Sequence, residues 1–422
     1  MQTVTIVGLG YIGLPLACLC AEKGLEVHGI DIDKEKISLI GQGISPIDDP
    51  ELKKKVNNLK GKISAKTNFD DAIKKSQIVI VCVPTPVDDK RLPNLNPLKS
   101  ACESISKTLQ KGTLIVIEST IFPGTTEEVI LPILKKSSTD FFLAHCPERI
   151  DPGNKKWTID NLPRVVAGID KKSTKKAAKF YRGIISSEIT ELSSVKAAEA
   201  TKIMENTFRD INIAFVNEMA MSFDKAGIDI LEVIRGASTK PFAFMPHYPG
   251  AGVGGHCIPV DPYYLIEKAK QIGFNHKFLS LGREINTHMP NYTVELLESQ
   301  LKKQSKSING AKVGVMGLAY KANVDDIRES PALAIINILK EKKADISIFD
   351  PLVKNKSNVD NLDELLQKSD YIILVTDHKE FKSIDLERLK KNKISIVIDG
   401  KNCLDKDKVK ALGILYRGIG RF

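Results

Sequence analysis

The sequence has few cysteines, and they are not arranged for a disulfide framework or a metal site. Seven are spread over 422 residues, and no two of them form a Cys-x-x-Cys pair. An odd number of scattered cysteines is typical of a reducing compartment, so we expect a cytoplasmic protein without a bound metal. Those in or beside apolar segments are expected in the core, namely Cys18, Cys20, Cys82, Cys102 and Cys146, while Cys403 is ambiguous.

Long uncharged runs are equally scarce. Gln2 to Ala21 carries no charged side chain and is long enough to imitate a signal peptide or a membrane span. No Lys or Arg precedes this run, and its glycines and Pro15 are unsuited to a lipid-exposed helix. No other segment approaches 18 apolar residues, so we expect no membrane association.

Acidic side chains are outnumbered by basic ones. The chain has 62 Lys and Arg against 52 Asp and Glu, a net charge of +10. Lysine runs such as 53–55 and 171–172 have no aromatic residues between them, which argues against a nucleic-acid surface. The charge therefore indicates a lysine-rich surface or an anionic ligand. With 42% hydrophobic residues the chain is globular, and its length predicts two or three domains.

The first residues combine a buried strand, a glycine-rich turn and a helix, which are Thr3 to Val7, Gly8-Leu9-Gly10-Tyr11-Ile12-Gly13 and Leu14 to Lys23. This is the dinucleotide-binding fingerprint: Gly8 makes the turn, Gly10 admits a pyrophosphate, and Gly13 allows close helix packing. The next strand, Glu26 to Ile30, ends on Asp31, which would bind a ribose hydroxyl and favour NAD over NADP. The alternative is a glycine turn in an α/β domain without a ligand.

Further apolar segments predict a parallel sheet with polar turns at one edge. The strands are Ile78 to Val83, Leu114 to Ile117 and Phe141 to Ala144, and the turns are Pro84-Thr85-Pro86, Glu118-Ser119-Thr120 and Cys146-Pro147-Glu148-Arg149. Ligands of open α/β sheets bind at the carboxyl ends of strands. Thr120 could equally cap a helix in the Pro123-Gly124-Thr125 turn.

The middle of the chain contains one long helical segment. Val195 to Ala226 has no Gly or Pro and would form a helix of nearly 50 Å, at about 1.5 Å per residue. We interpret this segment as a connector that also supplies a dimer interface. Lys202 and Asn206 lie one turn apart on it, although an ordinary polar face explains that spacing equally well.

A glycine-rich loop then precedes a cysteine. Gly250 to Gly255 contains four glycines, which would let the backbone approach a ligand, and Cys257 follows two residues later. It is the cysteine in a polar, glycine-rich loop, near the start of a helix predicted over Tyr263 to Ile272, where a thiolate is stabilised. Asp261 is the expected N-cap of that helix, a role that competes with a catalytic one.

The last part repeats the opening pattern without the glycine fingerprint. Strands are predicted over Lys312 to Met316, Asp345 to Phe349, Tyr371 to Val375 and Ile394 to Ile398, with a helix over Pro331 to Lys342. An insertion with Lys321, Asp325, Asp326 and Arg328 replaces the fingerprint, which indicates a second nucleotide. We predict domains over 1–194, 195–301 and 302–422.

Taken together, these motifs resemble the nucleotide-sugar 6-dehydrogenases, also called the UDP-glucose/GDP-mannose dehydrogenase family. The matching features are the glycine fingerprint, Val83 to Pro86, Glu118 to Thr120 before Pro123 to Thr126, Lys202 with Asn206, Gly254 to Cys257 with Asp261, and Arg328 to Pro331. The resemblance implies an α/β fold with two Rossmann-like doubly wound parallel-sheet domains, joined by a long central helix and a helical middle domain. It also implies NAD as cofactor and a homodimer or larger assembly.

Within the family, Cys146 to Asn154 departs from the Pro-Glu-Phe-Leu pattern of UDP-glucose enzymes. Together with Tyr248-Pro249-Gly250 and Ile258 to Pro262, it is similar to the UDP-N-acetylhexosamine branch. The implied substrate is UDP-N-acetylglucosamine first, UDP-N-acetylmannosamine second and UDP-glucose third, with polysaccharide biosynthesis as the setting. The other hypotheses are a hydroxy-acid dehydrogenase and a non-catalytic dinucleotide- or anion-binding protein.

The resemblance also implies residue roles. Cys257 would capture the C6 aldehyde as a thiohemiacetal that becomes a thioester. The other implied catalytic residues are Lys202, Asn206, Asp261, Thr120 and Glu148. The implied cofactor-binding residues are Gly8, Gly10, Tyr11, Ile12, Gly13, Asp31, Lys36, Pro84, Thr85, Thr120 and Arg328. The implied substrate-binding residues are Glu148, Arg149, Lys202, Asn206, Tyr248, Gly252, Gly254 and Lys321. Lys240 lies where relatives use a basic residue that reaches a neighbouring subunit.

Overall fold

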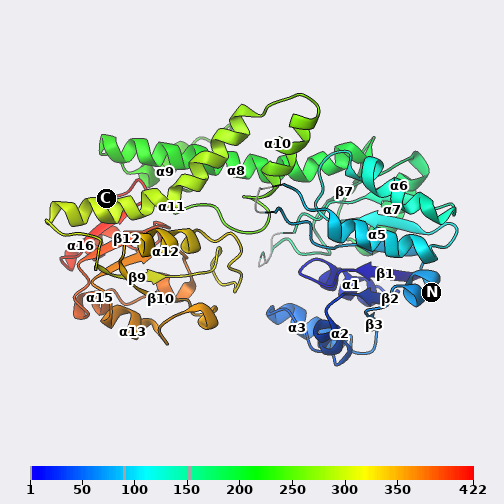
Figure 1. Cartoon of the computed structure of the whole chain (residues 1–422), viewed down its shortest axis with the longest axis horizontal. Helices are drawn as coiled ribbons and strands as arrows, with labels where there is room; N and C mark the ends of the chain where they lie inside the picture. Colours follow the sequence, from blue (N-terminus) through cyan, green and yellow to red (C-terminus); the bar gives the residue numbers. More distant parts are fainter. Residues whose placement is uncertain (1, 89–91, 151–153, 155) are drawn as a thin grey trace. The chain divides into compact units, whose positions relative to one another are not determined.

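The computed structural model describes residues 2–88, 92–150, 154 and 156–422. It separates into two compact units (Figure 1). The first unit comprises the residues up to Glu205 together with Tyr263–Phe274, and the second comprises Asn206–Pro262 and Asn275–Phe422. The residues of the predicted middle domain, 195–301, are therefore divided between the two units. Asp151 to Gly153 of the predicted branch motif lie outside the described residues.

The first unit is built on a sheet with strand order β3-β2-β1-β4-β5-β6-β7-β8. The strands are β1 (Thr3–Val7), β2 (Glu26–Ile30), β3 (Ile63–Lys66), β4 (Ile78–Val81), β5 (Leu114–Ile117), β6 (Phe142–His145), β7 (Arg164–Gly168) and β8 (Ile189–Glu191). The sheet is parallel except where β7 pairs antiparallel with β6, which departs from the fully parallel sheet that the sequence predicted. The expected doubly wound α/β class is confirmed.

Helices cover both faces of this sheet because its strands are apolar on both faces. Successive strand residues point to opposite faces. Ile6 and Ile80 therefore pack with α1 (Gly13–Glu22), α3 (Pro50–Asn58) and α7 (Lys171–Ile184), whereas Val7 and Val81 pack with α4 (Asp70–Lys75), α5 (Asn96–Thr108) and α6 (Leu131–Leu134). The helix α2 (Lys34–Gly41) follows β2.

The second unit has a parallel sheet in the order β10-β9-β11-β12-β13. Its strands are β9 (Lys312–Met316), β10 (Asp345–Phe349), β11 (Tyr371–Leu374), β12 (Ile396–Asp399) and β13 (Leu415–Gly418). One face packs on α9 (Ile230–Ser238), α11 (Lys277–Lys303) and α12 (Pro331–Glu341). The other face packs on α13 (Leu362–Gln367), α14 (Lys379–Lys382), α15 (Glu387–Lys391) and α16 (Lys406–Ala411). This unit is the second Rossmann-like fold that the sequence predicted.

Two helices contribute residues to both units. The helix α8 spans Val195–Ala226, the predicted range, and α10 spans Asp261–Gln271 rather than Tyr263 to Ile272. The earlier start of α10 has a clear cause, because the Asp261 amide already donates to the Cys257 carbonyl oxygen at 2.8 Å.

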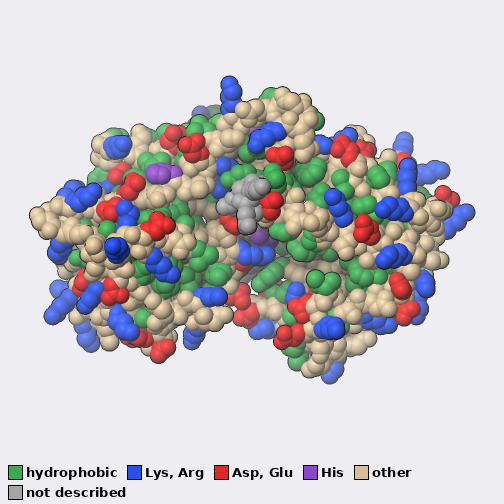
Figure 2. All heavy atoms as spheres, in the orientation of Figure 1, with side chains coloured by type: hydrophobic (Ala, Val, Ile, Leu, Met, Phe, Trp, Pro, Cys, Tyr) green, Lys and Arg blue, Asp and Glu red, His purple; other side chains and the backbone are tan. Residues whose placement is uncertain are grey.

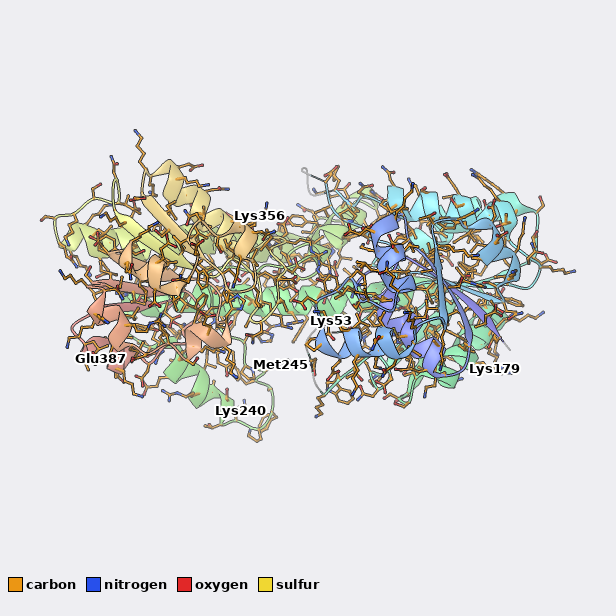
Figure 3. All side chains as sticks on the ribbon, turned by 90° about the horizontal axis from the view of Figure 1, so that it is seen from below. Lys53, Lys179, Lys240, Met245, Lys356 and Glu387 are labelled. Carbon is orange, nitrogen blue, oxygen red and sulfur yellow. The ribbon has the colours of Figure 1, made fainter. Side chains whose placement is uncertain are left out.

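The surface agrees with the interpretation of the net positive charge as a lysine-rich surface. On the face in Figure 2, Lys and Arg side chains are interspersed with Asp and Glu. In Figure 3, Lys53, Lys179 and Lys356 lie on separate elements. Within the described part of the chain, no helix combines the length and the apolar character needed to cross a membrane. The uncharged run at the start instead forms β1 and most of α1.

Candidate active site

The glycine turn after β1 has the form that a dinucleotide site requires. Gly8 has φ of +93°, and a Cβ on it would lie 2.7 Å from the Cys82 carbonyl oxygen. A Cβ on Gly13 would lie 1.8 Å from the Gly8 carbonyl oxygen, so the protein itself requires both glycines. A Cβ on Gly10 would meet nothing within 4 Å. Gly10 therefore has no packing role, and its open space suits the close approach of a pyrophosphate.

The surroundings of this turn also fit NAD. The helix α1 begins at Gly13 after Ile12, without a side-chain cap, so its N-terminal amides suit an anion. Asp31 is half-buried at the end of β2 and accepts from the Leu9 amide at 2.8 Å, which holds the turn. Tyr11 is 46% exposed beside the turn. Lys36 is on α2, and its Nζ lies 3.9 Å from the carboxylate of Asp33, the residue before that helix.

The turns after β4 and β5 are bonded to each other. The Thr85 hydroxyl donates to the Thr120 carbonyl oxygen at 2.6 Å, and Ser119 donates to the Val83 carbonyl oxygen at 2.7 Å. Pro84 is exposed beside them. Thr120 does not cap the helical turn that follows, since that turn starts after Thr125. The alternative role for Thr120 as a cap is therefore wrong.

Two side chains of α8 bind the carboxyl ends of β5 and β6. Glu199 accepts from the Gly124 and Thr126 amides, at 2.5 and 2.8 Å. Lys202 donates to the Glu148 carbonyl oxygen at 2.5 Å, and its Nζ lies 3.3 Å from the Glu148 carboxylate. Lys202 and Glu148 are only 6% and 4% exposed, so this is a buried ion pair. Sequence reasoning missed Glu199, whose signal is an acidic residue three positions before Lys202 on the same helix face.

Two other charged residues near this edge, Arg149 and Glu118, form ion pairs within the protein. Arg149 binds Glu205 through two nitrogens, at 3.0 and 2.5 Å, and also donates to the Pro163 carbonyl oxygen. Glu118 is fully buried, where it binds Arg164 at 2.8 Å and the Tyr181 hydroxyl at 2.5 Å. The expectation that Glu118 faces a ligand at the sheet edge is wrong, because burial and pairing remove its carboxylate from solvent.

The second unit holds Cys257 in a firmly anchored loop. Ahead of it, the Gly250 amide donates to Asn217, the Ala251 amide to Gly400, and the Gly255 amide to Arg328, at 2.9 to 3.0 Å. A Cβ on Gly254 would lie 2.6 Å from the Tyr320 Cβ. The glycines were expected to admit a ligand, but packing explains them here, since Gly252 would likewise meet Pro331 at 3.0 Å.

Asp261 and Asn206 form a bonded pair in the same unit. The Asn206 amide donates to the Asp261 carboxylate at 2.5 Å, and Asp261 is 2% exposed. Asn206 is on α8, and Asp261 is the first residue of α10, four positions after Cys257. The structure therefore brings Asn206 and Asp261 together, and the Asp261 carboxylate has a side-chain partner in addition to its place at the helix start.

The loop after β9 carries the predicted phosphate-binding residues. Lys321 is half-buried, and Arg328 is exposed and binds Asp326 at 2.5 Å. Burial raises the pKa of Asp326, but Arg328 more than offsets it, and the net pKa is lowered. His378 fixes this loop by accepting from the Asn323 amide and bonding Asp350, both at 3.0 Å.

Asp350 occupies the position that Asp31 has in the first sheet, but it serves the protein alone. It is fully buried and accepts from the Leu318 and Ala319 amides at 2.7 and 2.9 Å, besides His378. Burial raises its pKa, but these donors outweigh burial and hold the pKa at about 2. Asp350 is therefore structural, whereas half-buried Asp31 can face a ligand.

Cys257 is half-buried in the loop that precedes α10, whereas most of the other cysteines are buried. The five predicted core cysteines are buried, as expected. Burial raises the pKa of Cys18, Cys20, Cys102 and Cys146 to about 12 and raises that of Cys82 well above its usual range. Cys403 is half-buried, and burial raises its pKa as well. Such thiols are poor nucleophiles at neutral pH.

The second unit contains three further residues of interest, Lys401, Tyr248 and Lys240. Lys401 follows β12 beside the anchored Gly250-Ala251 backbone, and burial lowers its pKa. Sequence reasoning missed it, although a lysine directly after a strand's carboxyl end is a readable signal. Tyr248 is 61% exposed, and Lys240 lies with Met245 on the segment after α9 (Figure 3).

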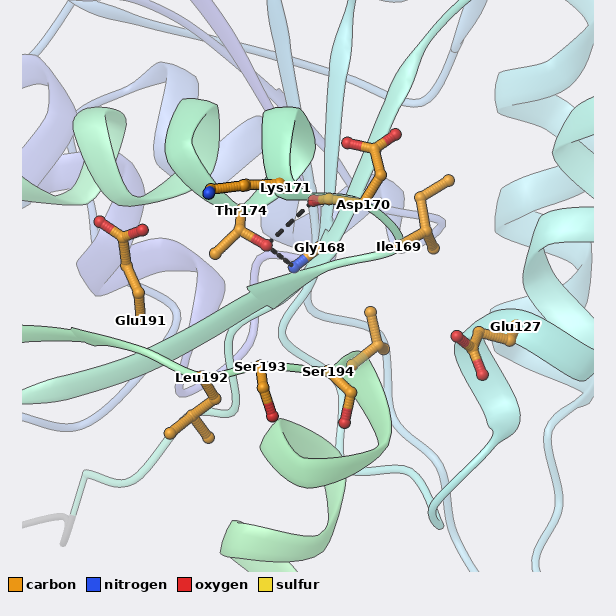
Figure 4. A pocket seen from close by; sticks show the side chains of 11 residues that line it. Glu127, Gly168, Ile169, Asp170, Lys171, Thr174, Glu191, Leu192, Ser193 and Ser194 are labelled. Carbon is orange, nitrogen blue, oxygen red and sulfur yellow. Dashed lines mark hydrogen bonds between the residues drawn. The ribbon is translucent and has the colours of Figure 1, made fainter.

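The first unit also has a cavity of about 600 Å³ at the starts of α7 and α8 (Figure 4). Its lining includes Asp170, Lys171, Glu191 and Ser194 and none of the predicted site residues. Asp170 and Ser194 already accept from helix amides there. The described residues contain no group of three His, Cys, Asp or Glu side chains placed to hold a metal ion.

Comparison with known proteins agrees with this geometry. Three domains of the UDP-glucose/GDP-mannose dehydrogenase family match: the NAD binding domain at residues 2–185, the central domain at 196–288 and the UDP binding domain at 314–406. A UDP-N-acetyl-D-mannosamine dehydrogenase of Pyrococcus horikoshii is 38% identical over 99% of both chains. A UDP-N-acetyl-D-glucosamine 6-dehydrogenase of Pseudomonas aeruginosa is 39% identical over 96% of this chain and 98% of its own.

Among solved structures, the UDP-D-ManNAc dehydrogenase of Pyrococcus horikoshii superimposes with a TM-score of 0.93 at 36% identity, covering 100% of this chain and 99% of that one. NAD is the cofactor, as the sequence predicted. The chain belongs to the UDP-glucose/GDP-mannose dehydrogenase family.

Proposed function

We propose that this chain oxidises the C6 hydroxymethyl group of a UDP-N-acetylhexosamine to the carboxylate. The observation that carries the proposal is Cys257, a half-buried cysteine in an anchored loop at the start of α10, four residues before the Asn206–Asp261 pair. The oxidation removes four electrons. Bound NAD⁺ supplies the hydride acceptor in each of two rounds, and the Gly8 to Gly13 turn with Asp31 would hold it.

Cys257 retains the intermediate between the two rounds. The first oxidation takes a hydride and a proton from the alcohol and leaves an aldehyde. The Cys257 thiolate adds to the aldehyde carbon, and its oxygen takes a proton, which gives a thiohemiacetal. Loss of the second hydride and of the hydroxyl proton leaves a thioester. Water then breaks the C–S bond, so that the carboxylate leaves and the thiolate is regenerated.

The buried polar pairs have separate tasks in this scheme. Lys202, held by Glu148, stabilises the oxyanion that develops at C6, and Asn206 adds a hydrogen bond. Asp261 exchanges protons with the reacting oxygen or water, and Thr120 and Glu148 orient that water. We propose that Lys321 and Lys401 bind the anionic UDP group and that Arg328 contacts the phosphates of NAD.

The exposed apolar side chains of α8 support self-association. Met204, Phe208 and Phe215 are 73%, 48% and 56% exposed, and their spacing places them on one face of the helix. Large exposed apolar side chains in a row mark protein interfaces. We therefore propose a homodimer through α8, with Lys240 as a residue that reaches the partner.

The identity of the hexosamine is the finer part of the proposal. UDP-N-acetylglucosamine stays the first prediction, and the Pseudomonas relative bears that name. UDP-N-acetylmannosamine, the sugar in the name of the Pyrococcus relative, is the alternative. The two sugars differ only at C2, so packing around the acetamido group decides between them.

The test counts NADH formed per sugar consumed. The full-length protein is assayed with UDP-N-acetylglucosamine, UDP-N-acetylmannosamine, UDP-N-acetylgalactosamine and UDP-glucose. We expect two NADH per molecule of a UDP-N-acetylhexosamine, and no uronate from Cys257→Ala. Cys403→Ala is the matched control and should keep the wild-type rate.

Three results would contradict the proposal. A ratio of one NADH per sugar would mean a two-electron dehydrogenase. Uronate formation by Cys257→Ala at the wild-type rate would remove the covalent step. Turnover of UDP-glucose alone would overturn the assignment to the hexosamine branch.

A further inference from the structure

A buried histidine joins the loop after β9 to the sheet of the second unit. This loop, residues 317–330, connects β9 to α12 and is called the β9–α12 loop below. His378 is 1% exposed, and its Nδ1 accepts from the Asn323 amide of the loop at 3.0 Å. Its Nε2 lies 3.0 Å from the carboxylate of Asp350, which directly follows β10. Because Nδ1 accepts, the ring proton is on Nε2 and is donated to Asp350. The imidazole therefore bridges the loop and the sheet.

Two further bonds attach the β9–α12 loop to the segment after β11. The Thr376 hydroxyl donates to the Ala319 carbonyl oxygen at 2.5 Å, and the Lys379 amide donates to the Asn323 side chain at 3.1 Å. Asn323 has φ of +61°, a left-handed conformation that asparagine adopts more readily than most residues. Asn323 is therefore held through both its backbone and its side chain, near the middle of the loop.

The β9–α12 loop starts at the edge of the sheet where a ligand is expected. Ligands of open α/β sheets bind at the carboxyl ends of the strands, and the loop directly follows β9. It contains Lys321 and Arg328, to which the proposed function assigns phosphate groups. The loop and His378 both lie within residues 314–406, the UDP binding domain. His378 itself is too deeply buried to contact a bound nucleotide, so any influence on binding has to pass through the loop.

We propose that His378 is a positioning residue that holds the β9–α12 loop in the conformation that binds the UDP group. The proposal rests on the proposed function and deepens it. Its physical basis is that a loop which leaves its binding conformation binds more weakly, in proportion to the fraction of molecules that keep that conformation. The bond from the Asn323 amide to His378 favours the binding conformation before the nucleotide arrives.

Two substitutions separate the two bonds of the imidazole. In His378→Gln, the amide nitrogen takes the place of Nε2, so the side chain still donates to Asp350 but no longer accepts from Asn323. In His378→Asn, the amide oxygen takes the place of Nδ1, so the side chain still accepts from Asn323 but no longer donates to Asp350. Only the first substitution detaches the loop.

The experiment measures the Kd of UDP for the full-length protein by isothermal titration calorimetry. We expect His378→Gln to raise the Kd about tenfold or more, because the fraction of molecules with the loop in place falls by that factor. His378→Asn should stay within about threefold of wild type, and the KM for the UDP-sugar should follow the same order. Urea unfolding should show both variants to be less stable, since each loses one buried hydrogen bond. A loss of stability alone therefore cannot produce the difference in Kd.

Ser357→Ala is the matched control. The Ser357 hydroxyl accepts from the Asp350 amide at 3.0 Å, so this variant loses a bond to Asp350 and leaves the β9–α12 loop attached. We expect its Kd for UDP to stay at the wild-type value. If His378→Gln does not fold, Asn323→Gly replaces it as the test, because glycine permits the same φ and removes the bond to the Lys379 amide. This variant should also bind UDP more weakly.

The proposal is overturned if His378→Gln, or Asn323→Gly in its place, binds UDP as tightly as wild type. It is also overturned if His378→Asn or Ser357→Ala weakens binding as much as His378→Gln does, because loosening around Asp350 would then explain the effect. Failure of the proposed function is distinguishable, since the wild-type protein itself would then not bind UDP.

Discussion

The buried pair of Lys202 and Glu148 allows a quantitative test. The change is Lys202→Met, which keeps a long side chain and removes the charge. The Glu148 carboxylate, 4% exposed, then loses the ammonium group 3.3 Å away. Breaking a buried ion pair by removing one partner costs about 3–5 kcal/mol, and we expect a loss of this size in the free energy of unfolding.

A substitution of the other partner, Glu148, should lower the free energy of unfolding by less. Glu148→Gln leaves intact the 2.5 Å bond from Lys202 to the Glu148 carbonyl oxygen, so we expect a loss of about 1–3 kcal/mol. The double variant has no unpaired buried carboxylate. Its loss should therefore be smaller than the sum of the single losses, by a coupling energy of about 1–3 kcal/mol.

Urea unfolding measures these losses, followed by the fluorescence of Trp157, the single tryptophan, which lies in the first unit. Activity gives an independent readout. Removal of one donor to a developing oxyanion lowers kcat about 10²–10³-fold, and the double variant should not recover it. Arg149→Met, which removes the partner of Glu205, serves as a comparison at a half-buried pair.

The reasoning is refuted by either of two results. If the free energy of unfolding of Lys202→Met lies within about 0.5 kcal/mol of the wild-type value, Lys202 and Glu148 do not form a buried ion pair of the expected strength. If the double variant loses the full sum of the single losses, Lys202 and Glu148 do not interact, whatever their distance.

Two further predictions concern the second unit and the α8 surface. Asp350→Asn should lower the free energy of unfolding by about 2–3 kcal/mol at pH 7, because the folded pKa of Asp350 lies at about 2 against an ordinary value of 3.8. A carboxylate with a depressed pKa stabilises the folded protein fully above its ordinary pKa of 3.8, and this stabilisation is lost as the pH falls through about 2. Urea unfolding should therefore show the difference in stability between wild type and Asp350→Asn narrowing below pH 4. A difference that stays constant with pH would contradict this. If the proposed dimer forms through α8, Phe208→Glu with Phe215→Glu should lower the mass in light scattering to that of a monomer, whereas an unchanged mass would contradict an interface on α8.

Local patterns in the sequence predicted much of the fold. The ranges of β1, β2, β5, β9, β10 and α8 agree with the structure residue for residue. They are predictable because an apolar strand between turn residues, or a long run without Gly and Pro, has one favourable local conformation. The antiparallel strand β7 and the long helix α11 were not predicted. The helix contains Pro290, which locally argues against a helix, and only packing against α12 and the sheet favours it.

The candidate site was predictable where the chemistry is local. The roles of Gly8 and Gly13 follow from their spacing in the fingerprint. In the structure, a Cβ at either position would collide with a backbone carbonyl oxygen. Glu199 was missed because its partners, Gly124 and Thr126, are more than 70 positions away.

Short motifs spread along the sequence identify the family, and the strand, turn and helix that would hold the cofactor lie within about 30 residues of one another. Folding then decides which residues remain available for chemistry. Asp31 and Asp350 both end the second strand of a Rossmann-like sheet, yet one is half-buried and the other fully enclosed. Glu118 was expected at a ligand edge and is paired with Arg164 in the core. Burial and pairing arise only when distant elements pack, so no local pattern can encode them.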